Sequence, residues 1–299
     1  MKILVTGANG LLGQKLVELY QKDSSVELVA TGLGRNRNKE GNYSYATMDI
    51  TSQSETSSII GMAMPDVVIN TAAMTNVDQC ELNQEACREL NVIAVQNLIK
   101  ACEDNGSKLI HLSTDFIFDG ENGPYEEDDW PNPLSYYAES KLEAEKLIEK
   151  TYLKWAIVRT MLVYGIVRDM SRTNIILWAK ENLESGKEIK VVDDQWRTPT
   201  LAEDLAKGID LIIKKNAEGI FHISGKDMLT PYDMAMETAS FFQLNPALIE
   251  KVDGTIFTQP AKRPPRTGFI LDKARKELGY EPVSFKEGLE VIKSQIGNG

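Results

Sequence analysis

Histidine and cysteine are scarce in this chain of 299 residues, which contains two histidines and three cysteines. The cysteines, Cys80, Cys87 and Cys102, are odd in number, and none is spaced as CxxC. The sequence therefore predicts neither a disulfide framework nor a zinc site, and we interpret the thiols as buried, small apolar groups. His111 and His222 lie in apolar stretches, LIHLS and IFHIS, and we expect core or edge histidines rather than metal ligands.

Long apolar runs and an excess of positive charge are also absent. No run approaches the roughly 20 residues of a membrane-spanning helix, and MKILVTGANG has too few apolar residues for a secretory signal core. Thirty-three basic residues against 44 acidic ones give a net charge of −11, which repels phosphate backbones and anionic lipid. We therefore expect a cytoplasmic protein that binds neither nucleic acid nor membranes.

Short apolar stretches alternate with longer amphipathic ones in the first half of the chain. The predicted strands are 2–6, 26–31, 66–73, 108–114 and 155–165, and the predicted helices are 11–22, 89–106 and 135–150. Continuously apolar strands alternating with helices are typical of a parallel sheet covered on both faces. The predicted fold class is therefore α/β, a Rossmann-type doubly wound parallel sheet.

Beyond residue 166 the pattern is looser. It predicts helices at 173–185 and 201–215, and strands at 188–193 and 219–224. We expect 219–224 to join the main sheet. The remaining pieces are expected to form a smaller C-terminal lobe over the carboxyl edge of that sheet.

Three glycines follow the first predicted strand directly. Gly7, Gly10 and Gly13 have the spacing GxxGxxG between a strand and a helix. Gly7 permits a tight turn, Gly10 lets the backbone approach a pyrophosphate, and Gly13 lets the helix pack closely on the strand. The helix N-terminus offers free N–H groups to an anion. The turn, with Leu11 and Leu12, is therefore a predicted dinucleotide site.

The end of the second strand lacks the carboxylate that usually holds the ribose 2′-hydroxyl of NAD. The stretch reads VATGLGRNRN (29–38), in which Arg35 and Arg37 follow the strand. Two arginines at this place favour a 2′-phosphate. We therefore predict NADP(H) as the cofactor and leave NAD(H) open.

A tyrosine and a lysine share one helix face in PLSYYAESK (133–141). Tyr137 and Lys141 are four residues apart, whereas Tyr136 is five residues from the lysine and points elsewhere. An ammonium beside a phenol is expected to lower the tyrosine pKa from about 10, which makes a usable general acid or base. The preceding strand ends at Thr114, whose hydroxyl could polarise a substrate carbonyl.

The motifs TGANGLLG, NTAA (70–73), STDFIFDG (113–120) and YAESK resemble those of the extended short-chain dehydrogenases/reductases, in particular the dTDP-4-dehydrorhamnose reductase family. Phe116 stands where that family usually has tyrosine. The resemblance implies a catalytic group of Thr114, Tyr137 and Lys141. In this group Tyr137 protonates the sugar carbonyl as hydride leaves the nicotinamide, and Lys141 also holds the nicotinamide ribose.

The same resemblance implies further cofactor contacts. Asp49 and Ile50 match the position at the adenine end, and Ala72 and Ala73 match the loop that lines the cofactor. Asn91 matches a helix asparagine that supports the site.

On the substrate side, the resemblance and the residue types point to Thr114, Asp115, Leu162, Arg197 and Arg263. Leu162 stands where relatives usually have tryptophan, and Arg197 where many have glycine. Both arginines could hold a substrate phosphate. Some relatives are said to bind magnesium through a carboxylate in the first helix, but the matching residue here is lysine, so no metal is predicted.

The predicted function is NADPH-dependent reduction of the 4-keto group of a nucleotide-linked 6-deoxy sugar, dTDP-4-dehydrorhamnose to dTDP-rhamnose. Dehydratases of this superfamily follow their threonine with Asp-Glu, and the missing glutamate argues against that reaction. Two alternative functions stay open, a nucleotide-sugar epimerase and a non-catalytic NADP-binding regulatory subunit. A homodimer also stays open. The predicted domains are an NAD(P)-binding domain, 1–165 with about 201–225, and a substrate-binding lobe, 166–200 with 226–299.

Overall fold

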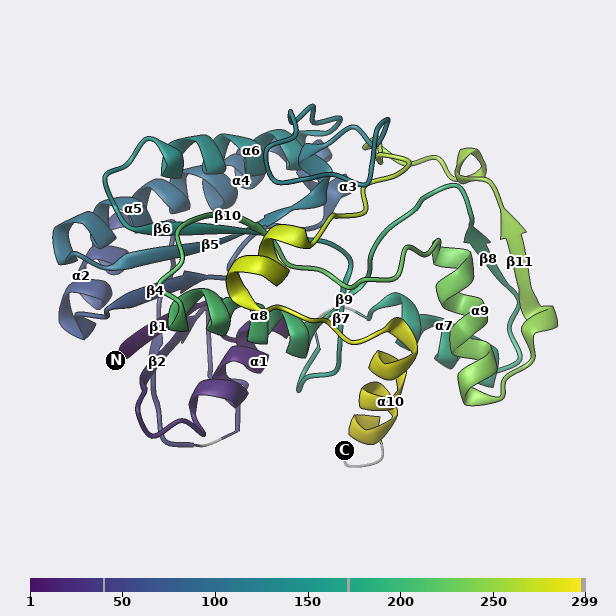
Figure 1. The fold of residues 1–299 in the computed structure, drawn as a ribbon, viewed down its shortest axis with the longest axis horizontal. Helices are drawn as coiled ribbons and strands as arrows, with labels where there is room; N and C mark the ends of the chain where they lie inside the picture. Colours follow the sequence, from purple (N-terminus) through teal and green to yellow (C-terminus); the bar gives the residue numbers. More distant parts are fainter. Residues whose placement is uncertain (40, 171–172, 297–299) are drawn as a thin grey trace.

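The computed structural model describes residues 1–39, 41–170 and 173–296. Within these residues the largest sheet has seven strands in the order β10-β6-β5-β4-β1-β2-β3, and every neighbouring pair is parallel (Figure 1). The strands are β1 (Lys2–Thr6), β2 (Glu27–Gly32), β3 (Ser44–Thr47), β4 (Val67–Asn70), β5 (Lys108–Thr114), β6 (Trp155–Thr160) and β10 (Gly219–His222). The strand order reverses between β1 and β4, where open α/β sheets bind ligands at the carboxyl edge.

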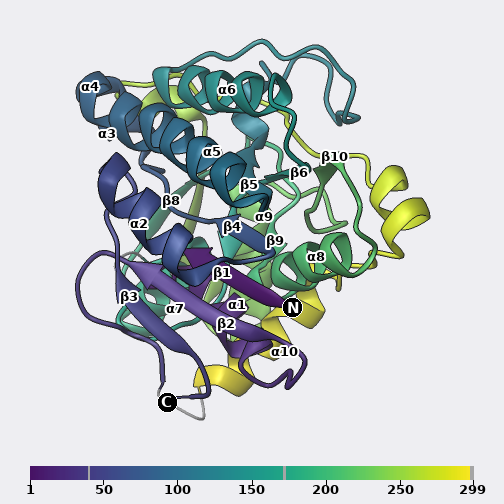
Figure 2. The same cartoon turned by 90° about the vertical axis from the view of Figure 1, so that its left-hand side faces the viewer.

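Helices cover both faces of this sheet, as Figure 2 shows. The layers are α1 (Leu11–Tyr20) and α8 (Ala202–Lys214) on one face, and α2 (Gln53–Ala63), α5 (Ala94–Asn105) and α6 (Tyr136–Glu149) on the other. Side chains of a strand point alternately to opposite faces, so Ile3 and Val5 enter the first core and Leu4 the second. The sheet is therefore buried on both sides, which explains its uninterrupted apolar strands.

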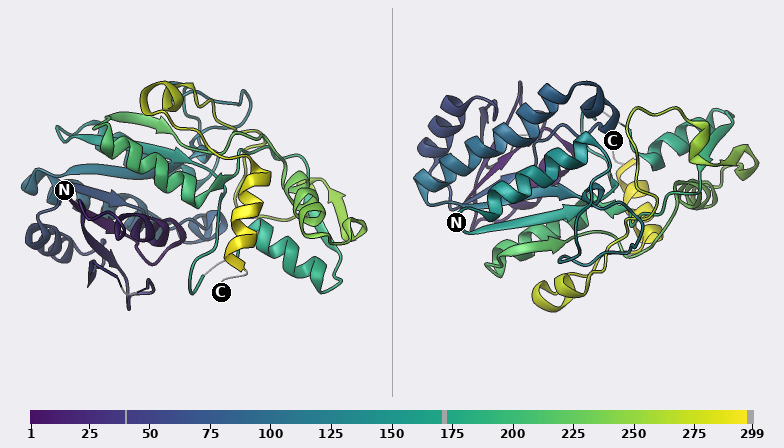
Figure 3. Two further views of the ribbon diagram at one scale, coloured as in Figure 1. Left: turned by 60° about the horizontal axis from the view of Figure 1, so that its bottom comes forward. Right: turned by 90° about the horizontal axis from the view of Figure 1, so that it is seen from above.

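A smaller lobe extends beyond the carboxyl edge, to the right in Figure 1 and in both views of Figure 3. Its elements are β7 (Val163–Tyr164), α7 (Ile175–Glu184), β8 (Ile189–Val192), β9 (Thr200–Leu201), α9 (Pro231–Phe242), β11 (Ile249–Val252) and α10 (Phe285–Ile296). β8 pairs with β11 and β7 with β9, both in parallel. The predicted lobe ranges include 171–172 and 297–299, which lie outside the described residues.

The predicted fold class is confirmed, and 219–222 form the edge strand beside β6. Two expected elements are interrupted. The predicted strand 155–165 breaks after Thr160, because Leu162 takes a left-handed backbone conformation with φ of 40°, which is unfavourable for a residue with a Cβ. The predicted helix 89–106 begins with a π-helical turn, Glu89–Ile93, that carries the buried Asn91. Such turns are frequent at functional sites.

Several elements were missed by the sequence patterns. In the first half of the chain they are β3, α2, α3 (Val77–Leu82) and α4 (Gln84–Arg88), and in the smaller lobe β9, α9, β11 and α10. β3 has four residues, all partly or fully exposed, and the helices α3 and α4 are too short to show a helical period. In the part of the chain that the structure describes, no helix combines the length and apolarity needed to cross a bilayer.

Candidate active site

At two positions of the turn after β1, only glycine fits. Gly7 has φ of +65°, and a Cβ there would lie 2.7 Å from Thr71 Oγ1 and 2.8 Å from the Ala72 nitrogen. A Cβ on Gly13 would overlap the Gly7 carbonyl oxygen. Gly10 is the N-cap residue of α1 and has no side chain to cap the helix, so the first N–H groups face outward as an anion site. The turn therefore fits a dinucleotide diphosphate, with Leu11 and Leu12 in the first helical turn.

The loop after β2 lies against this turn. The Asn9 amide donates to the carbonyl oxygens of Leu33 and Arg35, and the Asn9 side-chain oxygen accepts the N–H of Arg37. The Arg35 side chain is 87% exposed, with its guanidinium 3.6 Å from the Asp169 carboxylate. Asn9 thus holds the backbone of Arg35 and Arg37 beside the turn, a position compatible with the predicted contact to a 2′-phosphate.

The residues expected at the adenine end follow β3. Asp49 accepts hydrogen bonds from the backbone N–H and the hydroxyl of Thr51, and Ile50 is buried. Ala72 and Ala73 follow β4 at the same carboxyl edge as the glycine turn, and both are half-buried. These positions are compatible with the cofactor contacts implied by the resemblance.

Thr114 and Tyr137 are brought together at the carboxyl end of β5. Thr114 is the last residue of β5, and its side chain lies close enough to the phenol of Tyr137, one residue into α6, to act on the pKa of that phenol. The α6 N-cap Ser135 accepts the N–H of Ala138 at 3.4 Å, which fixes the start of the helix and so the place of Tyr137. The phenol also contacts Phe116 edge-on, with ring centroids 6.1 Å apart.

The expected lowering of the Tyr137 pKa is wrong for this structure. Burial raises the pKa of Tyr137 above its ordinary value of 10.0, and the Thr114 hydrogen bond opposes this rise. The Lys141 ammonium does not contribute, because Lys141 Nζ lies against the Leu112 carbonyl oxygen at 2.6 Å and His111 Nε2 at 3.1 Å. The raised pKa therefore favours the protonated phenol in this structure.

Asp115 and Arg197 meet behind Thr114 and are almost completely buried. The Asp115 carboxylate accepts from the hydroxyls of Thr114 and Thr267 and lies 3.7 Å from Arg197 Nε. Burial raises the Asp115 pKa, and the charge of Arg197 opposes this. The Arg197 guanidinium also donates to the carbonyl oxygen of Pro264 at 2.6 Å. Arg197 is therefore turned inward, and the expectation that it reaches a substrate phosphate does not match its position.

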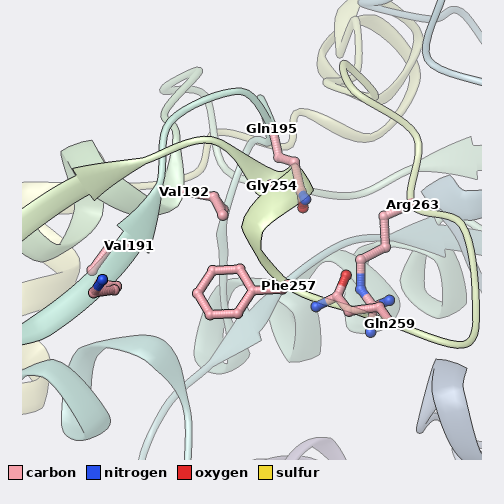
Figure 4. A pocket seen from close by; sticks show the side chains of 8 residues that line it. Val191, Val192, Gln195, Gly254, Phe257, Gln259 and Arg263 are labelled. Carbon is pink, nitrogen blue, oxygen red and sulfur yellow. The ribbon is translucent and has the colours of Figure 1, made fainter.

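Arg263 lines a cavity of about 200 Å³ in the smaller lobe. Figure 4 shows Phe257 near the middle of the cavity lining and Arg263 beside Gln259. The lining residues are Lys190, Val191, Val192, Gln195, Gly254, Phe257, Gln259 and Arg263. A basic group, an aromatic ring and amides suit the phosphate and base of a nucleotide.

Leu162 is 42% exposed between β6 and β7, so a substrate-facing role stays a prediction.

Lys15, the residue at the magnesium position of some relatives, pairs with Glu203 at 3.0 Å and Glu18 at 3.3 Å. Across 1–39, 41–170 and 173–296, no three His, Cys, Asp or Glu side chains gather as a metal site requires. The sequence patterns missed Asp78, the ion-pair partner of Arg263.

The doubly wound sheet, the glycine turn and the tyrosine–lysine helix after β5 define a short-chain dehydrogenase/reductase. The chain belongs to the family described as the RmlD substrate binding domain, which it matches over residues 1–296. A crystal structure of a dTDP-4-dehydrorhamnose reductase from Clostridium acetobutylicum is 31% identical, covers 99% of this chain and 100% of that chain, and has a TM-score of 0.89. The oxidoreductase family expected from the motifs is confirmed.

Two further comparisons bear on cofactor and role. The dTDP-4-dehydrorhamnose reductase of Bacillus anthracis in complex with NADP is 27% identical, with coverage of 98% and 99% and a TM-score of 0.84. Methionine adenosyltransferase 2 subunit beta of Bos taurus is 32% identical over 248 residues, which is 81% of this chain and 72% of that protein. The reductases therefore match over nearly their full length, and the subunit over a part.

Proposed function

We propose that this protein reduces the 4-keto group of a nucleotide-linked 6-deoxy sugar with NADPH, and that dTDP-4-dehydrorhamnose is its substrate. The observation that carries the proposal is the position of the Tyr137 phenol, which is buried beside Thr114 at the carboxyl end of β5, where burial raises its pKa. A carbonyl reductase needs an acid at that edge of the sheet, since the carbonyl oxygen takes up a proton as the carbon takes up hydride.

When bound, NADPH supplies the hydride. The backbone N–H groups at the start of α1 hold the diphosphate, and Arg35 accommodates the 2′-phosphate. Tyr137 gives its phenolic proton to the carbonyl oxygen, which becomes the sugar hydroxyl. The Thr114 hydroxyl lies beside the phenol and donates to Asp115 in the free protein, so it would have to turn from Asp115 to bond to the same oxygen. Asp115 and Arg197, buried behind Thr114, fix the end of β5.

The cavity beside Arg263 supports the nucleotide part of the proposal. Its guanidinium, with Phe257 and Gln259, would hold the diphosphate and the base. We propose that each predicted domain binds one ligand. Residues 1–165 with about 201–225 bind the dinucleotide, and 166–200 with 226–299 bind the sugar nucleotide. A separate proposal is that the protein forms a homodimer.

The alternatives are less well supported. Asp115 is followed by Phe116, so the glutamate of a dehydratase is missing. An epimerase must first take a hydride from a sugar alcohol, which needs a base for the hydroxyl proton, and then return it, which needs an acid. Burial raises the pKa of Tyr137, which disfavours the base form that the first step requires. The regulatory subunit matches a smaller share of its own length than the reductases do.

The test is a single-turnover measurement of NADPH absorbance with dTDP-4-dehydrorhamnose. A reductase oxidises NADPH in equal amount to the sugar nucleotide, an epimerase causes no net change, and a regulatory subunit causes no turnover at all. Tyr137→Phe should lower the rate by at least about 100-fold with NADPH affinity preserved. Tyr136→Phe, the neighbouring control, should stay within a few-fold of the native rate. If no 4-keto-6-deoxy sugar nucleotide causes oxidation, the proposal is wrong.

A further inference from the structure

The buried guanidinium of Arg197 binds the backbone of a distant segment. Arg197 lies between β8 and β9 and is 4% exposed. Its Nη2 donates to the carbonyl oxygen of Pro264 at 2.6 Å, and its Nη1 donates to those of Trp196 at 2.8 Å and Pro265 at 3.3 Å. A guanidinium in the interior needs partners for its N–H groups, because it always carries its charge. The backbone of 264–265 supplies two of these partners.

The remaining guanidinium nitrogen, Nε, faces Asp115 and lies 3.7 Å from its Oδ2. Asp115 is 2% exposed and accepts the hydroxyls of Thr114, at 3.1 Å, and of Thr267. In the part of the chain that the structure describes, Arg197 is the only basic side chain within 4.0 Å of this carboxylate. Burial raises the pKa of Asp115, and the charge of Arg197 opposes this. The arginine therefore favours the carboxylate form that accepts the Thr114 hydroxyl.

The same guanidinium lies over the ring of Phe116. Arg197 Cζ is 5.6 Å from the centroid of that ring, and the ring meets Tyr137 edge-on, with centroids 6.1 Å apart. The quadrupole of an aromatic ring attracts a cation placed over its face. Arg197 thus contacts both residues that follow Thr114, and the second of them contacts the phenol.

The carbonyl oxygens that Arg197 binds belong to the segment that carries Arg263. Arg263 immediately precedes Pro264 and lines the cavity proposed for the nucleotide. The backbone N–H of Trp196 also donates to the carbonyl oxygen of Pro265, at 2.7 Å, so the neighbour of Arg197 binds the same segment. The nucleotide end and the carbonyl end of the proposed substrate site are therefore joined through the buried side chain of Arg197.

We propose that Arg197 is a positioning residue for the proposed reaction, and that it fixes the nucleotide end of the substrate site, at Arg263, relative to the carbonyl end, at Thr114 and Tyr137. The planar fork of arginine suits this role, because it binds two carbonyl oxygens, pairs with a carboxylate and lies over a ring. The compact ammonium of lysine lacks this geometry. The proposal rests on the proposed function, since such a link matters only if one substrate spans both ends.

The first test measures the charge of Asp115 in the free, full-length protein. The carboxyl ¹³C resonances of aspartate are followed against pH, and Asp115 is assigned with Asp115→Asn. Asp115 should be ionised at neutral pH. Arg197→Met should raise the midpoint of its titration by about one pH unit or more, whereas Lys262→Met, an exposed cation beside Arg263, should leave it in place. A native Asp115 that is protonated at neutral pH, or an unmoved midpoint in Arg197→Met, would overturn the proposal.

The second test is kinetic, with NADPH saturating and the sugar nucleotide varied. Arg197→Met should raise the sugar-nucleotide KM by about tenfold. It should also lower kcat by about 10- to 100-fold, because a small misplacement of the reacting groups is costly. The KM for NADPH should change much less. Lys262→Met should leave all three constants within about twofold of the native values.

The pH profile separates positioning from a merely structural role. A protonated Asp115 no longer accepts the Thr114 hydroxyl, so the acid limb of kcat should move to higher pH in Arg197→Met, together with the Asp115 midpoint. Arg197→Lys keeps the charge and should keep the acid limb, but it should still raise the sugar-nucleotide KM. Loss of thermal stability alone, with kcat, KM and the acid limb unchanged, would contradict the proposal.

A double variant covers the case in which Arg197→Met does not fold, since that change leaves a buried carboxylate without its counter-charge. Arg197→Met combined with Asp115→Asn removes both charges. Its sugar-nucleotide KM should exceed that of Asp115→Asn alone, because the bonds to 264–265 are lost, and equal values would contradict the proposal. If no 4-keto-6-deoxy sugar nucleotide oxidises NADPH, the proposed function fails while the Asp115 titration is unaffected, so the two failures are distinguishable.

Discussion

Asp78 and Arg263 form a two-pronged ion pair, with Nη1 3.1 Å from Oδ1 and Nη2 2.7 Å from Oδ2. The residues are 185 positions apart. Asp78 lies in the first turn of α3, beside the sheet, and also accepts the N–H of Ala261. The hydrogen bond from Arg263 lowers the pKa of Asp78, so the carboxylate stays charged. The pair therefore fixes the segment that carries Arg263 and orients its guanidinium at the cavity.

Arg263→Ala should raise the KM for the sugar nucleotide by about tenfold, because a charge-assisted hydrogen bond contributes roughly 1.5–3 kcal/mol. The KM for NADPH should change much less. Asp78→Asn should also raise the sugar-nucleotide KM, since it leaves Arg263 without its fixed partner. The matched control is Lys262→Ala, the exposed neighbouring cation. Steady-state kinetics at saturating NADPH measure all three, and an unchanged KM in Arg263→Ala excludes this arginine from substrate binding.

Gly13→Ala should weaken NADPH binding by more than about tenfold and lower the melting temperature. The added Cβ would overlap the Gly7 carbonyl oxygen and lie 2.7 Å from Ala8 Cα, so the turn and α1 must separate. Gly61→Ala is the control: a Cβ there meets no atom within 4 Å, and alanine stabilises a helix by roughly 0.5–1 kcal/mol relative to glycine. Fluorescence titration with NADPH and thermal unfolding would show the contrast. Equal effects of the two changes would contradict the close approach at Gly13.

Arg35→Ala should reduce NADPH affinity by about tenfold and leave NADH affinity unchanged, because the 2′-phosphate is the group that Arg35 is expected to meet. The side chain is exposed beside Asp169, and the loop backbone is held by Asn9, so the substitution should not disturb the fold. Isothermal titration with each dinucleotide gives the two affinities. Arg275→Ala, a distant surface change, is the control. Native protein that binds NADH at least as tightly as NADPH would remove the basis of the NADP(H) assignment.

The parts of the site that could be predicted from the sequence depend on local spacing. The glycine turn, the strand that ends at Thr114 and the face shared by Tyr137 and Lys141 each follow from a few consecutive residues. Helix spacing places Lys141 on the face of Tyr137, but it does not predict the direction in which the Lys141 side chain points. His111 and the Leu112 carbonyl oxygen, which belong to the neighbouring strand β5, determine that direction because both lie against Nζ.

Long-range contacts explain the other differences between prediction and structure. Arg197 is buried because the carbonyl oxygens of the 264–265 segment and the Asp115 carboxylate surround its guanidinium. The Tyr137 pKa rises because the folded chain removes the phenol from water, and its sequence neighbours do not encode that burial. Short elements such as α3 were missed for a different reason. Their lengths give no measurable period, although α3 carries Asp78.

The Arg159–Glu145 pair gives a stability prediction that separates buried from exposed ion pairs on one helix. Arg159 Nη2 lies 2.8 Å from Glu145 Oε2, with side chains 4% and 2% exposed, and Arg159 Nη1 donates to the Glu127 carbonyl oxygen. Glu145→Gln leaves the buried guanidinium without its counter-charge and should lower the free energy of unfolding by about 3–5 kcal/mol. Urea denaturation measures this loss.

Glu143→Gln is the matched control for that loss, since Glu143 also lies in α6 and pairs with Arg88 at 3.1 Å, but with side chains 46% and 47% exposed. Solvent screens this pair, so its removal should cost no more than about 1 kcal/mol. Because Glu145 lies one turn beyond Lys141 and raises its pKa, the buried variant should also lower the pKa of Lys141, whereas the exposed variant should not. Equal unfolding free energies for the two variants would show that Arg159 finds another partner when Glu145 is neutral.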